Sequence, residues 1–241
     1  MRSALCGSRA GLHFEFVLGM GRKPRELSTE FPIHFTGRAN NREEFPIPLS
    51  EVWRIVTEYL YLVNRGFGLE IQSFVLMPNH FHLIARDAQD CMGNAMEWFM
   101  RETSREIGRS SGRINRIWGR RYHSSIIKTS LYWLHAYKYV YRNPIKAGLC
   151  RSVVEYPYST LTVLLGSRHG FLPTEHDGLL MNDVEATLEW LDYAFDPVEE
   201  ESIQRALKKR EFKLRQHPTT RKPLALENWE SVPAKLRNYR K

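Results

Sequence analysis

The chain has 241 residues, of which 42% are hydrophobic and 26% charged, and this globular composition excludes wholesale disorder. The formal net charge of +8 favours a polyanionic partner. Three scattered cysteines are too few for a disulfide framework or a thiolate metal site, and no apolar run approaches the roughly 20 residues of a membrane span, so we expect a cytoplasmic protein with no membrane partner.

Three segments are expected along the chain. Charged residues interrupt the apolar patches of residues 1–19, and a second methionine follows directly, so we predict a dispensable N-terminal extension there. Residues 20–165 carry the periodic patterns of the main domain. Residues 166–241 are predicted to form a helical, basic C-terminal appendage, with helices over residues 185–195 and 199–214.

The first two elements are a strand and a helix. Residues 31–36 alternate apolar and polar side chains and are rich in aromatic and β-branched types, which predicts a strand. Ser50 is a suitable N-cap for a helix over residues 51–64, where apolar side chains recur at helical spacing. Gly66 is expected to end that helix.

A hairpin and a second helix follow. Two β-rich runs, residues 70–77 and 80–86, flank the turn pair Pro78-Asn79 and predict two antiparallel strands. Residues 92–107 repeat apolar side chains at helical spacing and predict a helix that ends near Gly108.

The main domain closes with a strand and a third helix. Ile126-Ile127 predicts a short strand, and Ser130 is placed to cap a helix over residues 131–143. Pro144 disfavours helical geometry in the preceding residue, so the helix is expected to end there. The order strand, helix, strand, strand, helix, strand is typical of a ferredoxin-like or RRM-like α+β sandwich with a central antiparallel sheet.

Positive charge is concentrated in residues 101–151. This segment carries twelve Lys and Arg residues against two acidic residues, Glu102 and Glu106, so its net charge of +10 exceeds that of the whole chain. A solvated helix face usually mixes both signs of charge, so a polyanion-binding surface is the favoured interpretation.

The segment MPNHFHLI holds the first candidate for chemistry. Side chains at i and i+2 of a strand share one face, so His80 and His82 project together. Neighbouring imidazoles are a ligand pair for divalent cations. The competing interpretation is two polar residues on the solvated face of a half-buried strand, and the motif alone does not exclude it.

The predicted helix over residues 131–143 supplies the second candidate. His135, Tyr139 and Asn143 lie at i, i+4 and i+8 and therefore form one stripe. A phenol one turn before a carboxamide would place a hydroxyl and an oxygen ligand beside the same metal. The alternative is structural, because Asn before Pro is a common helix terminator and further tyrosines make this helix aromatic-rich.

Five motifs follow one another along the chain, namely FTGRANNREEF, MPNHFHLI, IWGRRY, YVYRNPIKAGL and EYPYS. This ordered set resembles the REP-associated tyrosine transposases, a family within the single-tyrosine HUH transposases. Ala39 stands where the family usually has Gly, and Gly119-Arg120 depart from the family pattern. The set covers residues 31–165 in order, so we interpret residues 20–165 as an HUH single-tyrosine transposase-like catalytic domain.

The resemblance implies a metal-dependent endonuclease and strand transferase. Its substrate would be single-stranded DNA with hairpins, processed in DNA transposition or repeat processing by a monomer or homodimer without a nucleotide cofactor. His80, His82 and Asn143 would hold a divalent metal, Mg²⁺ or Mn²⁺. Tyr139 would be the catalytic nucleophile and form a 5′-phosphotyrosine. Tyr141 is the competing nucleophile, but its side chain should point about 200° around the helix from Tyr139.

DNA-binding residues are expected in the early loop, the basic segment and the third helix. Arginines would hold phosphates, and Trp118 would either stack on an unpaired base or pack in the core. The predicted set is Arg38, Asn40, Asn41, Arg42, Arg116, Trp118, Arg121 and Arg142.

Two other functions stay open. A non-catalytic RNA- or DNA-binding module on a similar α+β scaffold would explain the charge and the aromatics, but it leaves His80, His82 and Tyr139 without a common role. A metal-dependent phosphodiesterase that uses water would need more carboxylate ligands, and Asp87 alone follows the histidine strand nearby. Covalent trapping separates the cases, because only the tyrosine mechanism joins protein to the 5′ end of a cut strand.

Overall fold

The computed structural model describes residues 27–87, 89–167 and 177–214, together with residues 172, 219 and 232. The extension predicted over residues 1–19 lies outside these described residues. Within the described part, none of the helices is both long enough and apolar enough to cross a membrane.

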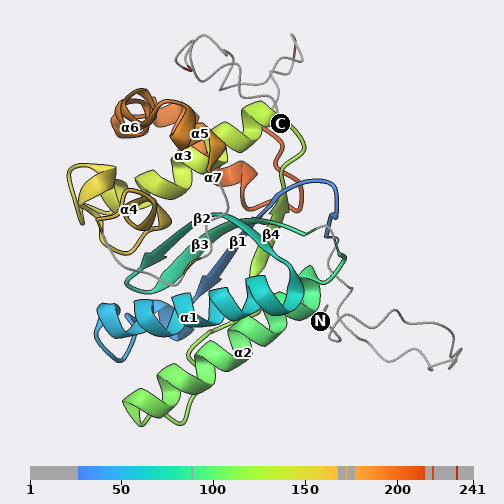
Figure 1. The fold of residues 1–241 in the computed structure, drawn as a ribbon, viewed down its shortest axis with the longest axis vertical. Coiled ribbons are helices and arrows are strands. Elements are labelled where there is room, and N and C mark those ends of the chain that lie inside the picture. Colours follow the sequence, from blue (N-terminus) through green and yellow to red (C-terminus); the bar gives the residue numbers. More distant parts are fainter. Residues whose placement is uncertain are drawn as a thin grey trace, which may run out of the picture.

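Four strands form one antiparallel sheet in the order β2-β3-β1-β4 (Figure 1). The strands are β1 (Ile33–Arg38), β2 (Glu70–Met77), β3 (His80–Arg86) and β4 (His123–Ile126). Two helices, α1 (Leu49–Phe67) and α2 (Met92–Ser111), complete the chain order βαββαβ. This arrangement confirms the ferredoxin-like α+β sandwich predicted from the sequence.

The hairpin has the predicted bounds, whereas the other strands are shifted. Strand β1 begins at Ile33 and runs on to Arg38, so it covers residues 33–38 and not 31–36. Strand β4 covers residues 123–126 and not Ile126-Ile127, because its pairing with β1 begins at His123. Tertiary pairing therefore sets strand ends that the local pattern leaves open.

Helix ends also differ from the predictions. Helix α1 begins at Leu49 after Pro48, so Ser50 is not its cap, and it continues past Gly66. It ends where Gly68 adopts φ +73°, and α2 likewise passes Gly108 and ends before Gly112, at φ +67°. In both helices the glycine that takes the left-handed conformation marks the end.

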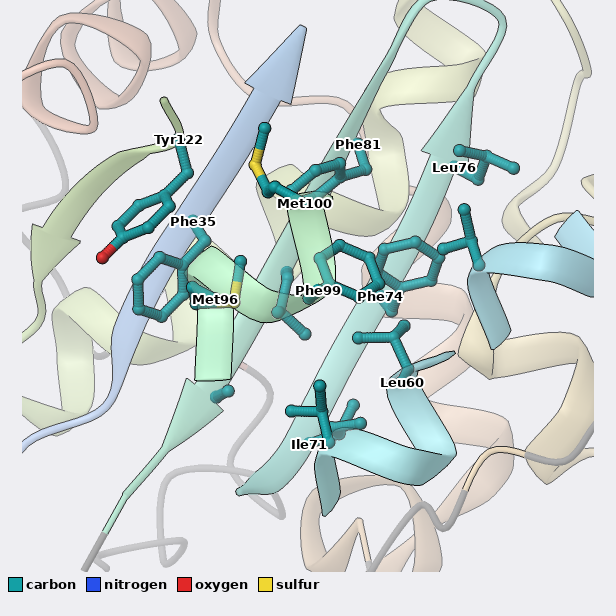
Figure 2. Packing of buried hydrophobic residues seen from close by; sticks show 14 of the residues in the cluster. Phe35, Leu60, Ile71, Phe74, Leu76, Phe81, Met96, Phe99, Met100 and Tyr122 are labelled. Atoms are coloured by element: carbon teal, nitrogen blue, oxygen red, sulfur yellow. The ribbon is translucent and has the colours of Figure 1, made fainter. Parts of the chain in front are cut away.

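Helices α1 and α2 cover one side of the sheet, called here the apolar face (Figure 1). Aromatic and aliphatic side chains fill the space between these two helices and the sheet, as Figure 2 shows. Packing is so close that a Cβ on Gly37 would lie 2.5 Å from the ring of Phe81 on the neighbouring strand. This position of β1 therefore requires glycine.

The opposite side of the sheet is called here the histidine face, because it carries His34, His80 and His82. Helix α3 (Ser130–Lys146) crosses it (Figure 1). The N-cap of α3 is Thr129, whose hydroxyl accepts the Tyr132 N–H at 3.2 Å, and not Ser130.

Helix α3 also continues through Pro144 and does not end at Asn143. The proline leaves the carbonyl of Val140 without its helical N–H partner. The side-chain amide of Asn143 compensates, since it donates to the carbonyls of Tyr139 at 2.8 Å and Val140 at 3.4 Å. Asn143, at which the helix was expected to end, instead stabilises the last turn of α3, which continues to Lys146.

The C-terminal elements pack over α3 and form a second core on the histidine side. They are η2 (Val153–Glu155), α4 (Thr160–Leu164), α5 (Gly178–Asn182), α6 (Val184–Asp192) and α7 (Pro197–Ala206). A separate short helix, η1 (Asn40–Arg42), lies in the early loop that follows β1. The helix predicted over residues 199–214 ends at Ala206. The chain then runs beside β4, where Ile126 N–H donates to the Arg210 carbonyl at 2.9 Å and Phe212 N–H donates to the Ile126 carbonyl at 2.8 Å.

Candidate active site on the histidine face

His80 and His82 project from the same face of β3, as their spacing predicts. Their ring centroids lie 5.1 Å apart. Across the strand pair, Arg38 lies opposite His80 and Thr36 lies opposite His82. The intervening Phe81 points to the apolar face and is fully buried there.

The ring of His80 is oriented by its neighbour in the β2–β3 turn. Asn79 donates its side-chain N–H to the carbonyl of Arg42 at 2.8 Å, which directs its Oδ1 to the other side. This oxygen lies 2.7 Å from His80 Nδ1. Because the oxygen can only accept, Nδ1 carries the proton and Nε2 of His80 keeps its lone pair for a ligand.

His82 has an imidazole partner that the sequence analysis missed. His34 Nε2 lies 2.8 Å from His82 Nδ1, and the two rings stack with centroids 5.1 Å apart. In the tautomer in which His82 Nδ1 donates to His34, Nε2 of His82 is left with its lone pair. The available signal was the predicted alternation of β1, which places His34 among the polar positions of that strand.

All three imidazoles are held in the neutral form. Burial, followed by the charge of His123, lowers the pKa of His34 to about 3. Burial and then Arg38 lower the pKa of His80 to about 4, and burial together with His80, His34 and Arg38 lowers the pKa of His82 well below its usual value. Neutral imidazole is the form that binds metal ions.

Tyr139 of α3 lies against His82. Its ring packs edge-on to His82 with centroids 5.9 Å apart, and the residue is only 6% exposed. Burial, assisted by the Glu200 carboxylate, raises the pKa of Tyr139 to about 12, while a hydrogen bond from Gln204 and the charge of Arg38 oppose that rise. The sequence analysis therefore missed Gln204 and Glu200, two neighbours that α7 brings to the phenol.

Tyr141 points elsewhere, as the helical rotation predicts. Its hydroxyl lies 2.8 Å from Thr160 Oγ1, and Thr160 Oγ1 in turn accepts the Phe74 N–H of β2 at 2.9 Å. The residue is 2% exposed, and burial raises the pKa of its phenol. Tyr141 therefore belongs to the packing between α3, α4 and β2.

His135 and Asn143 complete the predicted stripe on α3, with different surroundings. His135 Nδ1 lies 2.7 Å from the Leu131 carbonyl, and its ring stacks on Phe195 with centroids 6.3 Å apart. Asn143 is 8% exposed and uses its amide nitrogen within the helix, so its side-chain oxygen is the atom left for a ligand.

The donor set suits a divalent cation through two neutral imidazoles. In the described ranges, His, Cys, Asp and Glu side chains form no group of three arranged for a metal. Asp87, the carboxylate considered for a hydrolytic site, instead holds the turn that leads into α2, where its oxygens accept the N–H groups of Gln89 at 2.7 Å, Cys91 at 2.6 Å and Met92, the first residue of the helix. Any cation here would therefore rely on the two imidazoles, an amide oxygen and oxygens of its substrate.

The early loop is fixed next to this site. Ala39 N–H donates to the Asn79 carbonyl at 2.8 Å, and Asn40 N–H donates to the Ile117 carbonyl at 2.7 Å. Asn41 and Arg42 both adopt the left-handed conformation, with φ of 54° and 63°. The loop thus lies between the histidine hairpin and the basic segment, and Arg38, Asn41, Arg42, Arg116 and Arg121 are exposed.

Two residues predicted to bind DNA have other partners. Trp118 is 5% exposed, its ring packs edge-on to Phe45 and Phe81, and its indole N–H donates to Thr103 Oγ1 at 3.0 Å. It has no free face for base stacking, so the core interpretation replaces the stacking one. The guanidinium of Arg142 donates to the Leu191 carbonyl at 2.9 Å and to that of Asp192, so it caps the C-terminus of α6.

Comparison with known proteins finds a similar curated sequence and a solved structure with the same fold. No family model matches the chain. A curated protein of Escherichia coli (strain K12), the REP-associated tyrosine transposase, is 26% identical over 112 residues, which are 46% of this chain and 66% of that protein. The chain thus spans about two thirds of the length of this curated relative.

A solved structure shares the fold. It is the structure of a REP-associated tyrosine transposase bound to a REP hairpin, with a TM-score of 0.52 and 22% sequence identity, over 73% of this chain and 93% of that one.

The strand order defines a ferredoxin-like α+β protein, and the neighbouring rings of His80 and His82 form a candidate site on one face of its sheet. The comparisons confirm the resemblance that the sequence motifs indicate: the chain is similar in sequence to a curated REP-associated tyrosine transposase and shares its fold with a solved structure of such a protein.

Proposed function

We propose that this protein is a metal-dependent endonuclease and strand transferase that cuts single-stranded DNA beside a hairpin, in DNA transposition or repeat processing. The observation that carries the proposal is the contact between the ring of Tyr139 and that of His82, 5.9 Å apart, although the two residues lie 57 positions apart in the chain. The relative whose structure holds a REP hairpin supports hairpin-forming DNA as the ligand.

The two histidines would hold the cation, Mg²⁺ or Mn²⁺. His80 and His82 would bind through Nε2, with Asn79 and His34 fixing their rings from the other nitrogen, as outer partners of metal-bound histidines generally do. The side-chain oxygen of Asn143 would supply a further ligand. When bound, the cation would polarise the scissile phosphate and stabilise the charge of the transition state.

Tyr139 would form the covalent intermediate. Its hydroxyl oxygen would attack phosphorus, the bond from phosphorus to the 3′ oxygen would break, and the phenol proton would leave to the surroundings while the 3′ oxygen gains one. A pKa of about 12 keeps the phenol protonated at neutral pH, so its reactivity would depend on nearby positive charge, including Arg38. Attack by the 3′ hydroxyl of another strand would reverse the step and rejoin DNA.

Covalent trapping tests the proposal. Hairpin DNA with an adjacent single strand, labelled at the 3′ end, is incubated with protein and Mg²⁺ and then resolved on a denaturing gel. We expect wild type to give a protein–DNA adduct that Tyr139→Phe abolishes while hairpin binding persists. Tyr141→Phe is the matched control on the same helix and should retain the adduct. An undiminished adduct in Tyr139→Phe would refute the assignment.

Metal dependence is tested separately by thermal unfolding. Mn²⁺ should raise the melting temperature of wild type, and His80→Ala or His82→Ala should remove both this shift and cleavage. Persistence of both would exclude the metal site.

A non-catalytic hairpin-binding protein is the second candidate. The observation in its favour is that Tyr139 is 6% exposed and hydrogen bonded to Gln204 of α7, so DNA reaches the phenol only if α7 moves. Hairpin binding with no adduct under any metal condition would establish this alternative.

A further inference from the structure

Three polar side chains lie in one row across the histidine face, on the side of the sheet that α3 crosses (Figure 1). Ser73 of β2 lies opposite Ile84 of β3 in the strand register. Ile84 lies opposite His34 of β1, and His34 lies opposite Ser125 of β4. All four residues are at most 1% exposed, and His34 Nδ1, Ser73 Oγ and Ser125 Oγ have no hydrogen-bond partner among the described residues. The register thus places two unpartnered groups, His34 Nδ1 and Ser125 Oγ, at neighbouring positions of β1 and β4.

His34 uses its other ring nitrogen to bind His82. His34 Nε2 lies 2.8 Å from His82 Nδ1, and the planes of the two rings are inclined by 25°. One proton lies in this hydrogen bond, donated by one ring and accepted by the other. His34 therefore stands between a candidate metal ligand on β3 and the Ser125 hydroxyl on β4.

This pair of imidazoles has two neutral arrangements. In the first, His82 donates through Nδ1, so its Nε2 keeps a lone pair, and His34 carries its own proton at Nδ1. In the second, His34 donates through Nε2, so its Nδ1 is bare, and His82 carries its proton at Nε2. Each ring holds one proton in both arrangements, because burial lowers the pKa of His34 to about 3 and that of His82 well below its usual value. A proton at His34 Nδ1 therefore excludes a proton at His82 Nε2.

Only the first arrangement leaves His82 Nε2 free to bind a cation, and it needs an acceptor at the far end of the pair. The N–H at His34 Nδ1 is buried, and a buried N–H without an acceptor is costly. Ile84, which neighbours His34 on β3, is apolar and offers no side-chain acceptor. The hydroxyl of Ser125, which neighbours His34 on β4, can accept this proton.

We infer that Ser125 and His34 are positioning residues that select the metal-binding form of His82, which rests on the proposed function for the presence of a cation. The Ser125 hydroxyl accepts the Nδ1 proton of His34, and His34 in turn accepts the Nδ1 proton of His82. The bond to Ser125 forms by rotation of the serine side chain or through one bridging water, and both place the proton on the same nitrogen. A hydroxyl on an edge strand thereby sets the affinity of a site two strands away that it does not touch.

The position of the proton is measured directly in the protein without metal or DNA. Long-range ¹H–¹⁵N NMR correlation of protein labelled with ¹⁵N-histidine distinguishes a protonated from an unprotonated ring nitrogen at neutral pH. We expect the proton of His82 at Nδ1 in wild type. Ser125→Ala should lower the ratio of the Nδ1–H form to the Nε2–H form of His82 about tenfold, because the acceptor for His34 is lost. This variant removes no hydrogen bond that the structure shows, so it should fold as wild type does.

Metal affinity is the second readout and is measured by isothermal titration with Mn²⁺ in the absence of DNA. Ser125→Ala should weaken Mn²⁺ binding about tenfold, and His34→Leu should weaken it by at least as much, as expected when outer partners of ligating histidines are removed. His34→Gln should restore most of the affinity, because its side-chain oxygen can replace Nε2 as the acceptor of the His82 proton.

The matched control is Ser73→Ala. Ser73 Oγ is as buried as Ser125 Oγ, also lacks a partner among the described residues and lies in the same row, but Ile84 separates it from His34. Its removal should change neither the proton position nor the Mn²⁺ affinity.

The two serine variants also decide against the inference. Equal effects of Ser73→Ala and Ser125→Ala, or wild-type behaviour of Ser125→Ala in either measurement, would overturn it. If Ser125→Ala shifts the proton and weakens Mn²⁺ binding while wild type forms no covalent adduct with DNA, the inference stands and the proposed function alone is refuted.

Discussion

The two faces of the sheet are built from alternating residues of the same strands, yet they differ in polarity and in how well their buried groups are satisfied. On the apolar face, Phe35, Phe74 and Phe81 are fully buried against α1 and α2 (Figure 2). On the histidine face, His34 Nδ1, Ser73 Oγ and Ser125 Oγ are buried without a hydrogen-bond partner among the described residues. Each such group costs about 1–3 kcal/mol.

The difference assigns separate tasks to the two faces. The apolar face has the close packing that stabilises a fold, whereas the histidine face retains unsatisfied and neutral polar groups that weaken it. Such local departures from good packing are typical of functional sites. Three experiments test this division.

The largest loss of stability is expected on the apolar face. Phe99 of α2 is fully buried and packs edge-on to Phe81, with ring centroids 5.7 Å apart. Phe99→Ala should lower the free energy of unfolding by about 3–5 kcal/mol, because it removes apolar contacts and leaves a cavity. Urea unfolding measures the change. Leu62→Ala at a half-exposed site of α1 is the control, with an expected change of at most about 0.5 kcal/mol; a Phe99→Ala loss as small as that would contradict the division.

An intermediate effect is expected from acid on the histidine side. Burial lowers the pKa of His135 to about 4, so the folded protein binds fewer protons than the unfolded chain below the usual pKa of 6.5. The stability linked to His135 is complete above pH 6.5 and is lost as the pH falls toward 4, at up to about 1.4 kcal/mol per pH unit. His135→Gln should therefore flatten the decline between pH 6.5 and 5 by about 2 kcal/mol in urea unfolding. An identical slope in wild type and variant would show that His135 does not contribute.

The smallest losses of stability are expected from two asparagine side chains, one on each side of the sheet. Asn64 of α1 donates to the Leu69 carbonyl at 2.7 Å, and Asn143 of α3 donates to the Tyr139 carbonyl at 2.8 Å. Asn64→Ala and Asn143→Ala should each cost about 1 kcal/mol. Only Asn143→Ala should also reduce the Mn²⁺-induced rise in melting temperature, if the amide oxygen is a ligand. Equal metal responses of the two variants would leave Asn143 with a structural role alone.

Sequence periodicity predicted the elements whose pattern is local. The βαββαβ order, the hairpin bounds and the shared face of His80 and His82 follow from alternation and helical spacing. The partnership of His34 with His82 depends on which strands are neighbours in the sheet, and the local pattern does not contain that information. The predicted helix over residues 199–214 ends at Ala206, because the burial of Phe212 beside β4 outweighs helix propensity in residues 207–214.

The same contrast between local patterns and tertiary contacts separates the predicted DNA-binding residues that are exposed from those that are buried or paired. Composition identified the basic segment, and Arg116 and Arg121 are exposed as expected. Composition cannot distinguish an arginine that faces solvent from Arg142, which caps α6, or an exposed tryptophan from Trp118, which is enclosed by Phe45 and Phe81.

The carboxamide of Asn79 has a mechanical consequence. Its nitrogen donates to the Arg42 carbonyl, and its oxygen accepts from the His80 ring. One planar group thus connects the early loop to the His80 ring. The position of the early loop and the orientation of the His80 ring are therefore linked through the side chain of Asn79 alone. A ligand that moves the early loop would therefore also change the direction in which the His80 ring points.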